Sequence, residues 1–140
     1  MTEKRKARLD QALREDDLLT TYPVQVKELA DGCAQLTVQM ETGCRDLRGQ
    51  LHRGLLYALA DAAAVLAART ERGGLLRTIS STVDYPQQAE QPVKWLLAEG
   101  RVTRAGGRTV FCAAQIRDEE ERLLCRLDTV MAVAPDTESA

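Results

Sequence analysis

The sequence is poor in aromatic residues and in histidine. Its 140 residues include one Trp, one Phe, three Tyr and a single His, which is His52. A serine triad needs a histidine as general base beside the nucleophile, and no such triad is recognisable in this chain. Nucleophilic catalysis by a serine therefore has no support in the sequence.

The sequence also lacks the cysteine spacings of metal and redox sites. Its four cysteines, Cys33, Cys44, Cys112 and Cys125, form no CxxC pair and no Cys/His ligand pattern. We expect them to be small apolar residues with reduced thiols, although Cys112 and Cys125 are candidates to face each other across a predicted hairpin. Because the cysteines lack ligand spacing, we expect no bound metal or redox cofactor. Because the N-terminus does not resemble a cleavable signal peptide, the sequence predicts a cytoplasmic protein.

Neither charge nor hydropathy indicates a nucleic acid or a membrane as a partner. The formal net charge is −2, and acidic and basic residues are mixed along the chain, so no basic face is predicted. The most apolar stretch, Gly54 to Ala68, falls short of the roughly 20 residues that a membrane span needs, and much of it is alanine. We interpret this stretch as a buried helix of a soluble protein.

The length predicts one domain. A chain of 140 residues buries roughly two thirds of its unfolded surface around a single core, and two independent cores would be hard to build. We assign residues 1–134 to this domain and the polar residues 135–140 to a frayed tail.

Two helices are predicted, and the second is the longer. Charged residues and leucines alternate at near-helical spacing over residues 4–19, which indicates a short amphipathic helix. A loop at 41–50 leads into a helix at 51–69, which Gly73-Gly74 closes. Many alanines in this helix leave little side-chain bulk, so a sheet or a second helix is able to approach its backbone closely on nearly every side.

Six segments have the composition or alternation of strands, and three turn signals separate them into hairpins. The strands are expected at 24–29, 33–40, 76–85, 93–104, 109–118 and 123–133, and the turns at 31–32, 106–107 and 118–121. The order of hairpin, long helix and four strands is typical of an α+β domain in which one sheet wraps one helix.

Asp61 is the one charged residue between Gly54 and Ala68, where Tyr57 is the only other side chain with a polar atom. A carboxylate moved out of water without a partner is costly, so such a residue is usually supported or used. Asp61 is therefore either a buried acid paired with an arginine of a strand or partner subunit, or a catalytic group. Tyr57, one turn earlier, is more consistent with a core ring than with a proton donor.

Gly54 lies at the predicted start of the long helix. The first N–H groups of a helix have no intrahelical acceptor, and the helix dipole places partial positive charge there, so a carbonyl oxygen that gains negative charge would be stabilised. Asp61 lies seven residues further on, about 10.5 Å along the axis, which is too far to serve the same reacting carbon. The two groups can converge only across a two-fold dimer.

Two neighbouring motifs resemble those of the PaaI-like group of hotdog-fold acyl-CoA thioesterases. The motifs are Asp46-x-x-Gly49-x-x-His52-Arg53-Gly54 and, after it, Leu59-Ala60-Asp61. The family pattern is an Asn, a Gly three residues later, then His-Gly-Gly, and then Leu-Ala-Asp with the Asp nine residues after the His. The segments 82–85 and 99–102 also resemble the third and fourth strands of this family, so the resemblance covers roughly residues 20–133.

The resemblance implies a fold and an assembly. The fold is a hotdog: a long central helix wrapped by a curved antiparallel sheet of about five or six strands, here preceded by a short N-terminal helix. The assembly is a homodimer or a dimer of dimers, with active sites at the dimer interface. The implied substrate is an acyl-CoA thioester, and coenzyme A enters only as part of that substrate.

The resemblance also implies roles for individual residues. Asp61 matches the acid that attacks the thioester or activates a water, and Gly54 matches the helix-terminal oxyanion donor. His52 matches the histidine that shapes the entrance to this turn, but an imidazole before a helix also serves as a cap. Thr78, or Ser80 beside it, lies near a hydroxyl that orients the water in some members.

Two residues depart from the family pattern. Arg53 replaces the first glycine of His-Gly-Gly, and Asp46 replaces the asparagine. The guanidinium of Arg53 either pairs with a carboxylate on the acyl group or a phosphate of coenzyme A, narrows the pocket, or forms a salt bridge with Asp46. If Asp46 approaches Asp61 of the partner subunit, repulsion raises the pKa of one of the two carboxyls.

Arg104 and Arg108 flank the Gly106-Gly107 turn, where family members often contact the nucleotide of coenzyme A. The other interpretation is that both arginines are simply solvated.

The leading hypothesis is an acyl-CoA thioesterase. Because Arg53 and Asp46 depart from the pattern, a non-catalytic acyl-CoA binding or sensing protein is the alternative. A dehydratase or hydratase on the same fold is disfavoured, since those enzymes combine a histidine with an aspartate in another arrangement and only one histidine is present.

Overall fold

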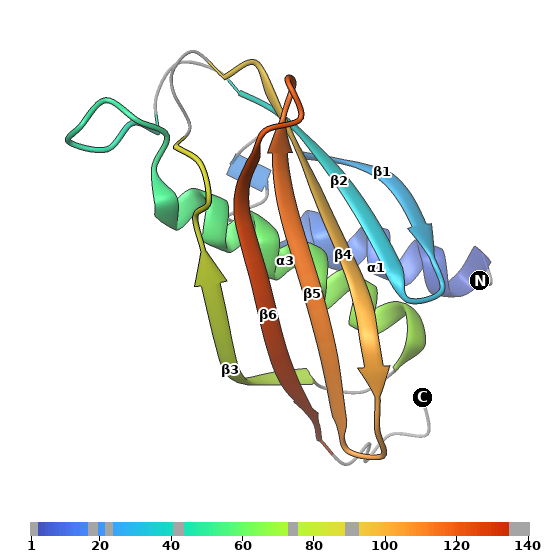
Figure 1. The fold of residues 1–140 in the computed structure, drawn as a ribbon. Coiled ribbons are helices and arrows are strands. Elements are labelled where there is room, and N and C mark those ends of the chain that lie inside the picture. Colours follow the sequence, from blue (N-terminus) through green and yellow to red (C-terminus); the bar gives the residue numbers. More distant parts are fainter. Residues whose placement is uncertain are drawn as a thin grey trace.

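The structure is a computed structural model that describes residues 3–16, 20–21, 24–40, 44–72, 76–88 and 93–134. Its centre is one antiparallel sheet of six strands in the order β1-β2-β4-β5-β6-β3 (Figure 1). The strands are β1 (Val24–Ala30), β2 (Cys33–Gln39), β3 (Leu76–Asp84), β4 (Trp95–Ala105), β5 (Thr109–Asp118) and β6 (Leu123–Val133). β3 pairs with β6 and not with β4, which follows it in the chain, so β1 and β3 form the two edges of the sheet.

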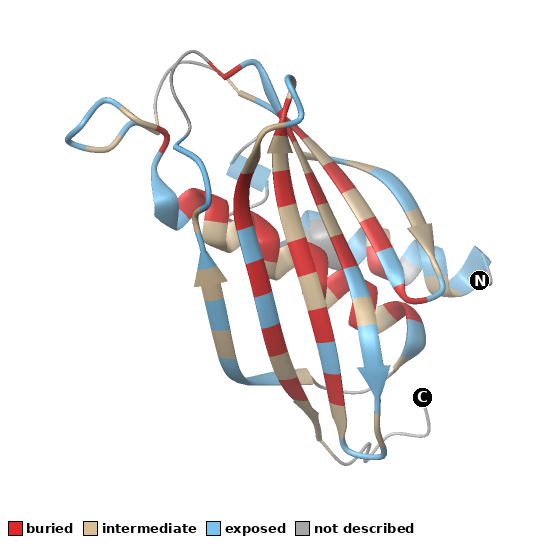
Figure 2. Ribbon diagram, in the orientation of Figure 1, coloured by how far each residue is buried: buried red, intermediate tan, exposed pale blue. Residues whose placement is uncertain are grey.

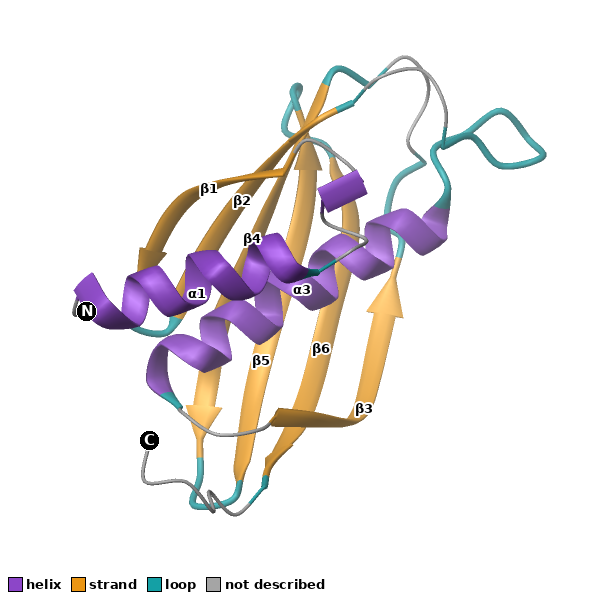
Figure 3. Ribbon diagram, turned by 180° about the vertical axis from the view of Figure 1, so that it is seen from behind, coloured by secondary structure: helices purple, strands orange, loops and turns teal. Residues whose placement is uncertain are grey.

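Both long helices lie on the same side of this sheet (Figure 3). α3 (Arg53–Glu71) packs directly on the sheet, and α1 (Glu3–Glu15) packs on α3. The guanidinium of Arg5 on α1 donates hydrogen bonds of 3.0 and 3.3 Å to the backbone oxygen of Arg69 near the end of α3. In the part of the chain that the structure describes, no helix covers the other face of the sheet.

The core lies between α3 and the sheet, and the strand pattern explains it. On β2, on β5 and in the first half of β4 every second residue is buried, and Figure 2 shows these residues as alternating bands. Successive side chains of a strand point to opposite faces, so the buried set faces α3. The largest fully buried side chains of the core include Leu36, Leu59, Leu96, Ile116 and Leu127.

The predicted close approach of the sheet to α3 is present at Gly100 of β4. A Cβ atom built on Gly100 would lie 2.2 Å from the backbone oxygen of Ala63 on α3. No side chain fits there, so this position of β4 requires glycine. This contact anchors the middle of α3, close to Asp61.

The predicted strand boundaries were mostly confirmed, whereas those of both helices need correction. α3 begins two residues later than predicted, because Leu51 forms a bridge with Arg45 and His52 caps the helix. α3 ends at Glu71, and the predicted Gly73-Gly74 stop lies outside the described residues. α1 ends at Glu15 and not at 19. Acidic residues at 15 and 16 are unfavourable at the negative end of a helix dipole, and residues 17–19 are outside the described ranges.

The four cysteines are free. Cys112 and Cys125 do not face each other, because Cys112 pairs with Thr129 and Cys125 with Ile116 in the β5–β6 register. Burial raises the pKa of each of these two thiols to about 11, so they are protonated at neutral pH and pack as apolar groups. None of the helices in the described residues is long and apolar enough to cross a membrane.

Candidate active site

The loop before α3 is held together by Asp46. Its Oδ1 accepts hydrogen bonds from the backbone N–H groups of Arg48 (2.8 Å) and Gln50 (3.1 Å), and Gly49 turns the chain with φ +78°. The hydrogen bond from the Gln50 amide is the largest cause that lowers the pKa of Asp46; burial opposes it, and the Arg48 amide and the positive charges of Arg48 and Arg53 lower the pKa further. Within one protomer Asp46 is therefore an ionised acceptor that shapes the loop.

His52 is the N-cap of α3. Its backbone is extended (φ −64°, ψ 124°), and its Nδ1 accepts a 3.0 Å hydrogen bond from the N–H of Gly54. A neutral imidazole that accepts at Nδ1 carries its proton on Nε2, so the ring presents a donor to solvent. The predicted oxyanion donor at Gly54 is thus already engaged with His52 in the structure.

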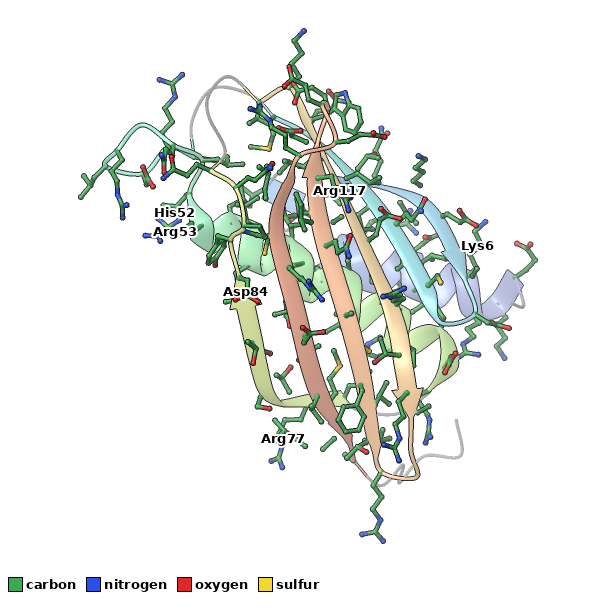
Figure 4. The ribbon with its side chains drawn as sticks, in the orientation of Figure 1. Lys6, His52, Arg53, Arg77, Asp84 and Arg117 are labelled. Atoms are coloured by element: carbon green, nitrogen blue, oxygen red, sulfur yellow. The ribbon has the colours of Figure 1, made fainter. Side chains whose placement is uncertain are left out.

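Arg53, the first residue of α3, is exposed and stacks on Tyr85. Its guanidinium carbon lies 5.8 Å from the centre of the Tyr85 ring, and the Tyr85 hydroxyl donates a 3.3 Å hydrogen bond to the backbone oxygen of Arg53. No salt bridge between Arg53 and Asp46 occurs among the described residues. Figure 4 shows His52 and Arg53 together at the start of α3, far from Arg77 at the start of β3.

Asp61 is half-buried on a stripe of α3 that the sheet does not cover. Tyr57 and Val65, at positions i−4 and i+4, are also partly exposed on this stripe. Desolvation raises the pKa of Asp61, and the negative charge of Asp16, just beyond α1, raises it further. Among the described residues no side chain or amide donates a hydrogen bond to this carboxylate, and no arginine pairs with it.

The remaining predicted residues lie at the other end of the molecule. Arg72, just beyond α3, donates hydrogen bonds to the backbone oxygens of Gly106 and Gly107, so the turn that carries Arg104 and Arg108 lies at the C-terminal end of this helix. Thr78 and Ser80 lie in the exposed first half of β3, which begins at the same end. A single protomer therefore does not bring these residues to Gly54.

A cavity of about 130 Å³ opens beside the start of α3. Its lining combines the loop, the helix start, the segment after β3 and the start of β6: Arg48, Gln50, Leu51, Arg53, Leu56, Tyr85, Gln87, Gln88 and Leu124. A 2.8 Å hydrogen bond from Gln50 Nε2 to Gln88 Oε1 joins two of these segments. Sequence reasoning assigned no role to Tyr85 or Gln88, and no local signal marks them, because their partners lie more than thirty residues away.

A second hollow of about 170 Å³ lies around Ala113 on the sheet face away from α3. Its polar lining comes from Gln35, Glu99, Arg101 and Gln115. The sheet separates it from Asp61 and His52, so it has no part in the constellation at the start of α3.

Comparison with known proteins gives one family model and many similar structures. The model described as the thioesterase superfamily matches residues 48–125, which include His52, Gly54 and Asp61 but not Asp46. The PaaI protein from the phenylacetic acid degradation operon of Escherichia coli superposes with a TM-score of 0.85 over 98% of this chain and 99% of that protein, at 17% identity.

Two further structures are informative. A mutant of phenylacetic acid degradation protein PaaI from Thermus thermophilus is 25% identical, with a TM-score of 0.76 over 84% of this chain and 99% of that one. A hypothetical thioesterase from Streptococcus pneumoniae, solved with coenzyme A, is 21% identical, with a TM-score of 0.74 over 82% of this chain and 91% of its own. These likenesses confirm the predicted hotdog fold and the resemblance to PaaI-like proteins.

Proposed function

Because this chain belongs to the thioesterase superfamily, we propose that it hydrolyses acyl-CoA thioesters at a site shared by two protomers. The observation that carries the proposal is the carboxylate of Asp61, which is half-buried and has no hydrogen-bond or ionic partner among the described residues. A residue of this kind is costly unless it is used, and it lies on the helix whose N-terminus is suited to a developing oxyanion. A structural neighbour that binds coenzyme A supports the choice of thioester.

The proposed site takes groups from two protomers, and two features of one protomer support this. Gly54 and Asp61 are separated by about 10.5 Å along α3, and β3 is an open sheet edge whose residues from Arg77 to Ser80 are exposed (Figure 2). An open edge strand is a template for pairing with another chain. Within one protomer the end of β3 lies near Arg53. If two β3 edges paired in antiparallel fashion, this end would lie beside the start of β3 in the other protomer.

The same pairing would bring together the predicted residues at the start of α3 and those at the opposite end of the protomer. Thr78, Ser80, Arg104 and Arg108 lie at the end of the protomer opposite to Gly54, so a two-fold axis near the middle of β3 brings them toward the partner subunit's helix start. The partner's exposed stripe of α3 supplies Asp61. We propose that the hydroxyls orient water and that the arginines of the turn bind the nucleotide of coenzyme A.

The proposed reaction begins with the thioester carbonyl at the start of α3. The Gly54 N–H exchanges its bond to His52 for one to the carbonyl oxygen, which makes the carbonyl carbon more electrophilic. The Asp61 carboxylate then either attacks this carbon, expelling the thiolate and leaving an anhydride that water hydrolyses, or takes a proton from a water that attacks directly. In both routes the products are the carboxylic acid and the thiol of coenzyme A, and no other cofactor takes part.

The raised pKa of Asp61 suits this role, because a carboxylate that holds its proton more tightly is a stronger base. His52 has a positioning role: it orders the first turn of α3 and holds the Gly54 amide until substrate arrives.

Release of free thiol from a panel of acyl-CoA substrates tests this proposal. Asp61→Asn and Asp61→Ala are expected to lower kcat by roughly 10²- to 10⁴-fold, whereas Glu28→Gln, at an exposed position of β1, should match the wild type. Wild-type rates from Asp61→Ala would refute the assignment of Asp61.

The alternative is an acyl-CoA binding or sensing protein without turnover. Two observations favour it: the Gly54 N–H is occupied by His52, and Arg53 stands where the family pattern has a glycine. Tight binding of an acyl-CoA without thiol release across the whole panel would select this function over hydrolysis.

A further inference from the structure

The cavity beside the start of α3 has an apolar floor and a cationic rim. Leu51, Leu56 and Leu124 are apolar, whereas Arg48 and Arg53 contribute two guanidinium groups and the remaining polar side chains are amides and the Tyr85 hydroxyl. No carboxylate lines the cavity in the described part of the chain. Such a lining suits a ligand with an apolar body and a negatively charged end.

Arg53 is held in place at this rim, and among the described residues no carboxylate forms an ion pair with it, although Arg53 and Arg48 both attract the Asp46 carboxylate through space. The Tyr85 ring lies under the guanidinium, and the Tyr85 hydroxyl bonds to the Arg53 backbone. Among the described residues neither Arg53 nor Arg48 forms a side-chain hydrogen bond or ion pair. The nearby acid, Asp46, uses Oδ1 for the amides of its own loop. A stacked guanidinium without a partner has several N–H donors to offer a ligand.

The position of Arg53 indicates which part of a thioester it meets. It directly precedes Gly54, the proposed donor to the thioester carbonyl. The phosphates of coenzyme A are separated from this carbonyl by the long pantetheine arm, whereas the acyl chain starts at it. A guanidinium next to the carbonyl site is therefore placed to contact the acyl chain.

We propose that Arg53, positioned by Tyr85, makes this site selective for acyl groups that end in a carboxylate. The inference rests on the proposed function and specifies its substrate class. A guanidinium and a carboxylate form a pair of parallel, charge-assisted hydrogen bonds. A neutral acyl chain of the same length leaves the guanidinium without a partner at the rim and loses these bonds.

The test compares two substrates of equal chain length, adipoyl-CoA and hexanoyl-CoA. The wild type is expected to have the higher kcat/KM for adipoyl-CoA, and Arg53→Gln should lower the ratio of the adipoyl-CoA value to the hexanoyl-CoA value by roughly ten- to hundredfold. Tyr85→Leu removes the stacking and should reduce the preference by roughly two- to fivefold. Tyr85→Phe keeps the ring face and should retain most of the preference.

Two further variants are controls. Arg53→Lys keeps the charge without the planar fork and should retain part of the preference. Arg14→Gln changes an exposed arginine of α1 and should leave both substrates unaffected. Circular dichroism and unfolding curves show whether each variant is folded, and Arg53 is exposed, so we expect Arg53→Gln to fold normally.

The outcomes separate this inference from the proposed function. Hydrolysis with no preference for adipoyl-CoA, or an equal loss of both rates in Arg53→Gln, would overturn the selectivity but leave the thioesterase proposal intact; the equal loss would indicate a phosphate contact. If the protein hydrolyses neither substrate, calorimetry measures the binding affinity of adipoyl-CoA and of hexanoyl-CoA instead. Tighter binding of adipoyl-CoA that Arg53→Gln abolishes supports the selectivity even if hydrolysis fails, whereas no binding and no turnover of either ligand overturns both.

Discussion

At the scale of single residues, the chemistry depends on the environment of Asp61. One carboxylate lies among apolar and small residues on α3, desolvation raises its pKa, and Asp16 adds to the effect. In the described residues nothing compensates this charge within one protomer. Function is therefore expected to come at a cost in stability, as is common for groups held ready for catalysis.

This cost has a defined pH dependence. Because the pKa of Asp61 is raised in the folded protein, its protonated form is favoured by folding, and this favourable contribution is lost as the pH rises through the folded pKa. Asp61→Asn should therefore increase the free energy of unfolding at pH 7, and the gain should vanish below about pH 3.9, the value for an unfolded aspartate. Urea unfolding of the wild type and of Asp61→Asn, at pH 7 and at about pH 3.5, measures this difference in the free energy of unfolding. A less stable Asp61→Asn at pH 7 would show that a partner compensates the carboxylate.

The sequence predicted where Asp61 stands but not the contacts around the helix start. A lone acid in an apolar helix is visible in the chain itself, since it breaks the pattern. The cap between His52 and Gly54 and the amide bonds to Asp46 depend on loop geometry, which residue types alone do not fix. The stacking of Arg53 on Tyr85 joins residues that are distant in the sequence.

At the scale of elements, strands were easier to predict than helix ends. β5 and β6 begin and end as predicted, because turn residues bound an alternating pattern on both sides. α3 was predicted two residues too early, because Leu51 fits the apolar period of the helix but is held by its bridge to Arg45. Such a local hydrogen-bond competition leaves no mark on hydrophobic periodicity.

The contact between α3 and β4 gives a prediction at this scale. Gly100→Ala would place a Cβ atom 2.2 Å from the Ala63 backbone oxygen, so helix and sheet must move apart. We expect a loss of about 1–3 kcal/mol in the free energy of unfolding. Gly107→Ala is the matched control, because its Cβ would meet nothing within 4 Å, and it should change stability by less than about 1 kcal/mol. Equal effects in urea unfolding would show that the close packing at Gly100 is not important.

At the scale of the whole molecule, the proposed active site requires two protomers. The sequence predicted this from the seven-residue separation of Gly54 and Asp61 alone. The structure adds an open β3 edge, a partly exposed stripe of α3 and a second group of polar residues at the opposite end of the protomer. In a single chain the β3 edge is unpaired, the stripe of α3 is partly exposed, and the polar residues lie away from Gly54. A dimer with one two-fold axis near β3 would give all three features a partner.

Mixing two inactive variants shows whether one active site is built from two protomers. Asp61→Asn removes the acid, and Gly54→Val covers the amide at the helix start, since Cβ atoms tilt toward the N-terminus of a helix. Each variant alone should release almost no thiol from an acyl-CoA, whereas subunits mixed in equal amounts form hybrid dimers with one intact site and should recover about a quarter of the wild-type rate. No recovery from confirmed hybrid dimers, or full activity of Asp61→Asn alone, would contradict a site built from the acid of one protomer and the helix start of the other.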